Sequence, residues 1–214
     1  MDEEVTIINA NNRNEKIKNF FIKNKKILIT IISIIIIFFI GYFSFDEINK
    51  RNKIKLGNQY NSTIIDYEDG KKEKVIRSLI TLVNKKDKTY SPLALYFLID
   101  KNLIESKDEV NNLFDILINE TNVESEIKNL IIYKKALFNS DSMKENELIQ
   151  ILNPIINSDS IWKSHALYLM AEFFYSKNEL EKSKEFFNQI LILPNSNPEI
   201  KIEAQKKINR DLSE

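Results

Sequence analysis

The chain has 214 residues, enough for one or two domains, and its 31 Lys+Arg balance its 31 Asp+Glu. This balance gives no support for a nucleic-acid-binding protein, which needs a basic surplus. With no Cys and one His, the chain has neither a disulfide framework nor the residues for a Cys-based or multi-His metal site. Three Gly and four Pro leave few helix breakers, which favours long helices over a turn-rich β-fold.

Residues 27–45 contain no charged side chain. At about 1.5 Å of rise per residue, this helix would span about 28 Å, close to the ~30 Å hydrocarbon core of a bilayer. A buried core helix is disfavoured because a soluble core rarely needs apolar side chains all round a helix. A cleaved signal peptide is disfavoured because Phe, Ser, Phe and Asp stand at 43–46, where small residues are expected. We predict an uncleaved transmembrane signal anchor.

The orientation of this anchor is predicted from its flanking cations. The 15 residues before the span carry six Lys or Arg and the 15 after it carry four. The positive-inside rule then places a basic tail, residues 1–26, in the cytoplasm and the C-terminal domain outside. Residues 46–214 carry 25 Lys+Arg against 27 Asp+Glu, so this part offers no electrostatic attraction to anionic lipid or nucleic acid.

Beyond the span, apolar residues recur with a helical period. One stripe falls at i, i+1, i+4, i+5 and i+8: Val75, Ile76, Leu79, Ile80 and Val83. Similar stripes occupy residues 113–118, 148–155 and 186–191. No segment sustains a two-residue alternation, so we predict no sheet.

Several residues predict where these helices begin and end. Two N-caps followed by Pro at the first helical position are predicted at Ser91-Pro92 and Asn197-Pro198. Two further prolines, Pro154 and Pro194, are expected to end helices. Asn178 is expected in a helix-helix turn that needs a left-handed residue.

A short internal repeat indicates that the helices are arranged in pairs. Ala94-Leu95-Tyr96 recurs as Ala166-Leu167-Tyr168, 72 residues later, and each copy precedes an acid, a turn and a second helix. Residues 124–139 and 144–156 supply another pair. Such pairs cannot bury their apolar faces alone and therefore stack into an α-solenoid.

The last pair, residues 166–194, resembles a tetratricopeptide repeat. Its matching positions are Met170, Ala171, Phe174, Asn178, Leu180, Glu181, Ser183 and Phe187. It departs from the pattern at Ile190, where a small residue is usual, and at Pro194, which comes one place early. The middle pairs match poorly, so the expected fold is all-α, with an N-terminal transmembrane helix followed by divergent tetratricopeptide-like hairpins. A generic helical hairpin is the alternative.

The whole layout resembles a bacterial single-span tetratricopeptide-repeat family that includes the ancillary subunit of the SecYEG-type translocon. The resemblance covers roughly residues 16–210, with a membrane-proximal helix at 46–70 and a repeat domain at 71–214. It implies a single-pass protein of the bacterial inner membrane with a periplasmic domain. It also implies protein partners: translocon subunits, periplasmic chaperones or secreted clients.

In a tetratricopeptide pair the first helix faces the partner groove. Four residues fall on that face at i, i+3, i+7 and i+10, and two more take the matching places two units earlier: His165, Tyr168, Glu172 and Tyr175, then Tyr96 and Asp100. Tyrosine suits a peptide groove because it offers both area and a hydroxyl. Ordinary half-exposed helix residues are the alternative interpretation.

Catalytic patterns are weak in this chain. The acids at 66, 68 and 69 resemble a calcium-binding loop, but Gly70 falls one place too early for the required spacing. Three scattered Gly cannot form a phosphate-binding loop. We therefore expect a non-enzyme without metal or cofactor, acting as a membrane-anchored periplasmic interaction protein. The alternative functions are a structural scaffold for cell-envelope growth or division and an enzyme of unknown type.

Overall fold

The computed structural model describes residues 15–16 and 18–212. Most of the predicted cytoplasmic tail, residues 1–14 and Ile17, lies outside the described residues. Within the described part, helices joined by short turns make up the chain and no strand occurs, which confirms the all-α prediction. The chain divides into two compact units, one ending at Lys55 and the other beginning at Leu56.

The first unit contains most of helix α2, Lys25–Glu68. Its apolar side chains point to the outside all round the helix, with Ile37 69% and Phe38 68% exposed. The most apolar window of α2 has no buried residue, which a core helix of a soluble protein would have. Near the start of the span the Thr30 hydroxyl donates a hydrogen bond to the Lys26 carbonyl, so this polar group is satisfied within the helix. By length and composition, α2 is one candidate membrane-spanning helix near the N-terminus.

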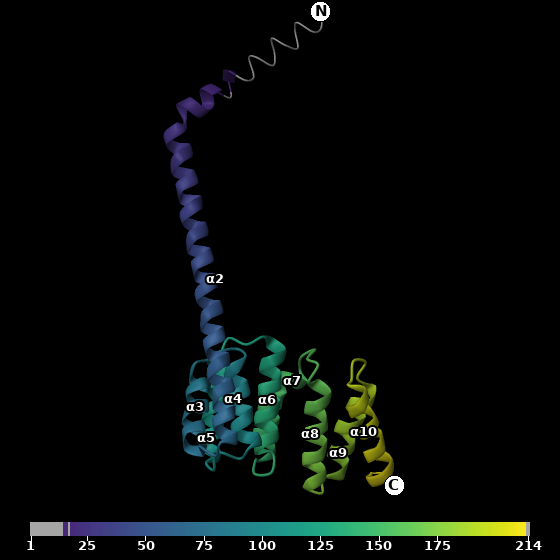
Figure 1. Ribbon diagram of the computed structural model, residues 1–214. Coiled ribbons are helices and arrows are strands. Elements are labelled where there is room, and N and C mark those ends of the chain that lie inside the picture. Colours follow the sequence, from purple (N-terminus) through teal and green to yellow (C-terminus); the bar gives the residue numbers. More distant parts are fainter. Residues whose placement is uncertain (1–14, 17, 213–214) are drawn as a thin grey trace, which may run out of the picture. The chain divides into compact units, whose positions relative to one another are not determined.

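The second unit combines the end of α2 with eight further described helices. These are α3 (Lys72–Asn84), α4 (Tyr90–Asp100), α5 (Lys107–Asn119), α6 (Ser125–Asn139), α7 (Glu145–Ile156), α8 (Lys163–Ser176), α9 (Leu180–Ile192) and α10 (Pro198–Asp211). From α3 onward each helix packs against the next one in the sequence. The colours in Figure 1, which follow the sequence, therefore run from teal through green to yellow across this unit. Contacts also join α3 with α5, α6 with α8, and α8 with α10.

The core of this unit is a row of three apolar clusters rather than one centre. The first lies among α3, α4, α5 and α6, the second among α6, α7 and α8, and the third among α8, α9 and α10. The predicted stripes supply them: Val75, Leu79 and Val83 are completely buried in the first cluster. Because each cluster needs several consecutive helices, no single hairpin covers its own apolar face.

The last turns of α2 belong to the first cluster. The ring of Tyr60 lies 6.1 Å from that of Tyr90, and the rings of Tyr67 and Phe97 meet edge to face at 5.2 Å. Gly57 is buried beside Tyr90, and a Cβ added at Gly57 would lie 2.5 Å from the Tyr90 hydroxyl oxygen. The missing side chain at Gly57 therefore leaves room for the Tyr90 side chain against this part of α2.

Two of the predicted boundaries are confirmed. Asn197 caps α10, since its side-chain oxygen accepts hydrogen bonds from the backbone N–H groups of Glu199 and Ile200 at 2.9 and 3.2 Å. Asn178, between α8 and α9, has a φ of 61°, the left-handed conformation expected for this turn.

Two other boundary predictions are wrong. Pro154 does not end α7, which continues to Ile156, where the buried Ile155 still packs in the second cluster. Ser91 does not cap α4: the Asp87 carboxylate accepts from the N–H of Tyr90, while the Ser91 hydroxyl donates to the Leu82 carbonyl at 2.7 Å. In both cases tertiary packing decides the boundary over local preference.

Candidate partner-binding site

A cavity of about 240 Å³ lies between α4 and α6. Three lining residues lie on one face of α4: Tyr96, Ile99 and Asp100. Three more lie on one face of α6, namely Lys134, Leu137 and Phe138, and Phe114 comes from α5. Its base is aromatic, since the fully buried Phe114 lies 6.1 Å from the ring of Phe138. At the rim, Leu137 is 48% exposed. The volume is below the range of about 300–1,000 Å³ typical of drug-sized ligands and suits one large apolar side chain.

Three polar side chains of this cavity, Tyr96, Lys134 and Asp100, lack a hydrogen-bond or ion-pair partner among the described residues. The Tyr96 hydroxyl oxygen is buried without a hydrogen-bond partner. The Lys134 ammonium lies 4.6 Å from the centre of the Tyr96 ring, a cation–π contact, and neither Lys134 nor Asp100 forms an ion pair with a described residue. Burial raises the pKa of Tyr96, so its hydroxyl stays protonated and can donate. Two donors and a carboxylate acceptor therefore accompany an apolar cavity.

The predicted residues of α8 fall into two groups. Tyr168, Glu172 and Tyr175 face α9 and α10, where Lys207 lies 2.9 Å and 3.1 Å from the two Glu172 carboxylate oxygens and 4.9 Å from the centre of the Tyr175 ring. The Tyr168 ring packs edge to face on Phe187 at 5.4 Å. These contacts join α8 to its following helices and occupy much of the predicted stripe.

The charges around Lys207 stabilise this junction. Although partial burial acts to lower it, the hydrogen bond to Glu172 raises the pKa of Lys207 overall. Burial, with the nearby Glu172 carboxylate, also raises the pKa of Tyr168. Both side chains therefore keep their protons at neutral pH, and the Glu172–Lys207 pair holds α8 to α10.

His165 lies in a different, aromatic group. Its ring is 5.0 Å from that of Trp162 and 5.9 Å from that of Tyr133, and the latter two stack on each other at 6.0 Å. Burial lowers the pKa of His165, which keeps the imidazole neutral at pH 7. His165 and Trp162 are thus packing residues at the junction of α6 and α8.

A second cavity, of about 310 Å³, lies between the end of α6 and α8. Its lining is more polar and includes Glu172 beside Phe173, with Ser140, Asp141, Leu169, Ser176 and Lys177. Of the six predicted groove residues, the structure therefore places Tyr96 and Asp100 at the α4–α6 cavity and Glu172 at this one. His165, Tyr168 and Tyr175 line neither.

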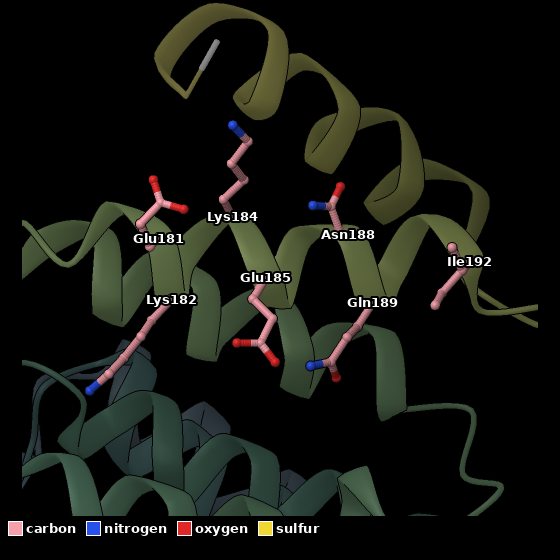
Figure 2. A pocket seen from close by; sticks show the side chains of 7 residues that line it. All are labelled: Glu181, Lys182, Lys184, Glu185, Asn188, Gln189 and Ile192. Carbon is pink, nitrogen blue, oxygen red and sulfur yellow. The ribbon is translucent and has the colours of Figure 1, made fainter. Parts of the chain in front are cut away.

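The outer face of α9 is an open, charged surface rather than a site (Figure 2). All of the side chains on this face come from α9: Glu181, Lys182, Lys184, Glu185, Asn188, Gln189 and Ile192. Lys182 pairs with Glu145 of α7 at 3.0 Å and with Glu179 at 2.7 Å, so it serves packing. Within the described residues, no three His, Asp or Glu side chains converge to hold a metal ion.

The sequence analysis did not identify Lys134 or Phe138 as site residues, and it placed Phe114 only in an apolar helix stripe. The only local signal was the i, i+3, i+4 spacing of Lys134, Leu137 and Phe138, which any packed helix can show. No protein-family model, curated protein or solved structure matches this chain.

Proposed function

We propose that this chain is a membrane-anchored interaction protein that binds a protein partner across α4 and α6. Anchoring is assigned to α2, with the N-terminus in the cytoplasm and the helical unit in the periplasm of a bacterium. The observation that carries the proposal is the apolar α4–α6 cavity with its three polar groups, on a chain that also has an exposed apolar helix. The resemblance to the ancillary translocon subunit gives the partner class: translocon subunits, chaperones or clients emerging from the channel.

The proposed architecture is a short α-solenoid of divergent tetratricopeptide-like hairpins. The first residues of α4, α6, α8 and α10 are spaced by 35 to 38 residues, close to the repeat length. Close packing of the α8–α9 pair supports the same interpretation. The buried Ser183 hydroxyl donates to the carbonyl of Ala171 at 2.8 Å, and both small side chains let the helices approach.

A partner segment fits the cavity as an apolar anchor residue with its adjoining backbone. The side chain would fill the space beside Phe114 and Phe138, where burial of aromatic area gives most of the binding energy. Its carbonyl group would accept from Tyr96 or Lys134, and its N–H would donate to Asp100. A partner would then satisfy the buried Tyr96 hydroxyl, whose burial without a partner costs about 1–3 kcal/mol.

Site-specific photo-crosslinking in living bacteria tests this function. A photoreactive residue at Leu137, on the rim of the cavity, is expected to capture translocon subunits or chaperones. Ile192, which is 80% exposed on α9, is the matched control position and should not capture them. Recovery of cell-wall enzymes from position 137 would instead support the scaffold alternative. Identical products from both positions would contradict the assignment of the cavity.

A further inference from the structure

The residues at and just before the start of α2 carry a dense positive charge. Between residues 15 and 26 there are five lysines and a single acid: Lys16, Lys18, Lys23, Lys25 and Lys26 against Glu15. None of these lysines forms an ion pair with another described residue, whereas lysines elsewhere in the chain do. Among the described residues, these ammonium groups beside the start of the apolar span therefore have no carboxylate partner.

Three consecutive large apolar side chains lie between Lys18 and Lys23. Phe20 and Phe21 are each 57% exposed and Ile22 is 64% exposed, and the two Phe rings meet edge to face at 6.0 Å. Phe20 and Phe21 have no packing partner beyond each other among the described aromatic contacts. Exposed aromatics beside lysines are typical of segments that lie in the interface of a membrane.

The backbone bends between this segment and α2. The helical residues 18–23 are separated from α2 by a turn at Asn24, whose side-chain amide donates to the Phe20 carbonyl at 3.0 Å. Figure 1 shows the short helical segment at residues 18–23 running in a different direction from α2. Once Ile27 is in the hydrocarbon core, Lys26 and the residues before it are within a few residues of the lipid headgroups.

We propose that residues 15–16 and 18–26 bind the anionic phospholipid headgroups of the leaflet from which α2 enters the membrane. The lysines pair with headgroup phosphates, and Phe20 and Phe21 insert at the boundary between headgroups and acyl chains. This inference requires only that α2 spans the membrane, so it holds or fails independently of the partner proposed for the α4–α6 cavity. It assigns the segment a lipid-binding role beyond that of setting topology.

The absence of Cys allows a direct test, because a cysteine placed at Asn19 is the only one in the chain. The full chain carrying an environment-sensitive dye at this position is reconstituted in vesicles of pure phosphatidylcholine and of an equimolar mixture with phosphatidylglycerol. The dye emission is expected to shift to the blue in the anionic vesicles only, and to return with added salt, which screens exposed charges.

Two variants separate charge from folding. Lys16→Gln, Lys18→Gln and Lys23→Gln together should lower the ratio of membrane-bound to free segment by about 100-fold, about fivefold for each lysine. The same three lysines changed to Arg keep the charge and should keep the shift. Equal emission in both kinds of vesicle, or an unchanged shift in the Gln variant, would overturn the proposal. Reversal of the shift by a short RNA would also overturn it, since nucleic acid would then be the preferred ligand.

Discussion

Replacing Tyr96 with Phe is expected to stabilise the helical unit while weakening partner capture. The substitution removes one buried hydroxyl that has no hydrogen-bond partner within the described residues. It keeps the aromatic ring and therefore its packing, together with the cation–π contact from Lys134 at 4.6 Å. The substitution therefore creates neither a cavity nor overpacking, which are common causes of destabilisation in a core.

The magnitude follows from the cost of an unsatisfied hydroxyl. Relieving it should raise the free energy of unfolding by about 1–3 kcal/mol. For a domain of this size, about 1 kcal/mol corresponds to a rise of about 2–4 °C in Tm. In the bound state the same hydroxyl would donate to the partner, so its loss should weaken binding by about 0.5–1.5 kcal/mol, or up to about tenfold.

Thermal unfolding of the full chain in detergent micelles, followed by circular dichroism, measures the first effect. The yield of crosslinks from a photoreactive residue at position 137 measures the second. Tyr133→Phe is the matched control, because the Tyr133 hydroxyl is not among the buried groups without a partner and should change neither quantity appreciably. A lower Tm for Tyr96→Phe, or undiminished crosslinking, would refute the role given to this hydroxyl.

Three further predictions address other contacts. In a Tyr90→Ala background, Gly57→Ala should lower the free energy of unfolding less than in the wild type, by about 1 kcal/mol or more, because the added Cβ no longer meets the Tyr90 hydroxyl. Urea unfolding of a double-mutant cycle measures this difference, and additive effects would show that the Tyr90 contact does not limit the side chain at position 57. The pKa of His165 is lowered by burial, so stability should fall as pH drops below about 6.5, where the unfolded chain binds the proton first, and His165→Phe should flatten that part of the profile; an unchanged profile would remove the histidine from the account. The pKa of Lys207 is raised, so the stability that it contributes should persist through neutral pH and decline only above about pH 10.4; Lys207→Met should reduce the alkaline decline in stability, and a variant whose decline equals that of the wild type would contradict the Glu172–Lys207 link.

Local patterns predicted the parts of this fold that depend on local physics. The stripe with Val75 and Leu79 is buried because a helix of the right period must turn that face to its neighbours. Asn197 followed by Pro198 starts α10 because both residues act within a single turn. The apolar run of α2 was recognisable from sequence because a helix that is apolar on every side cannot bury all of its side chains in the core of a soluble domain.

Features that depend on how helices pack were not predictable in the same way. Pro154 was expected to end a helix, yet only one backbone hydrogen bond is lost there and Ile155 remains packed. Of the candidate site, Tyr96 and Asp100 were identified from the repeat. Lys134 was not, because its approach to Tyr96 joins helices whose relative position no short pattern encodes. The same limit applies to Lys207, whose contacts with Glu172 and Tyr175 place the predicted stripe against α10.

Labelling of single cysteines in intact bacteria tests most directly whether α2 crosses the membrane with the helical unit on the outer side. The chain has no native Cys, so Leu137→Cys and Asn19→Cys each report one position. A maleimide that cannot cross the inner membrane should label position 137 in intact cells, and position 19 only after permeabilisation. Labelling of position 19 in intact cells, with position 137 protected until permeabilisation, would contradict the account.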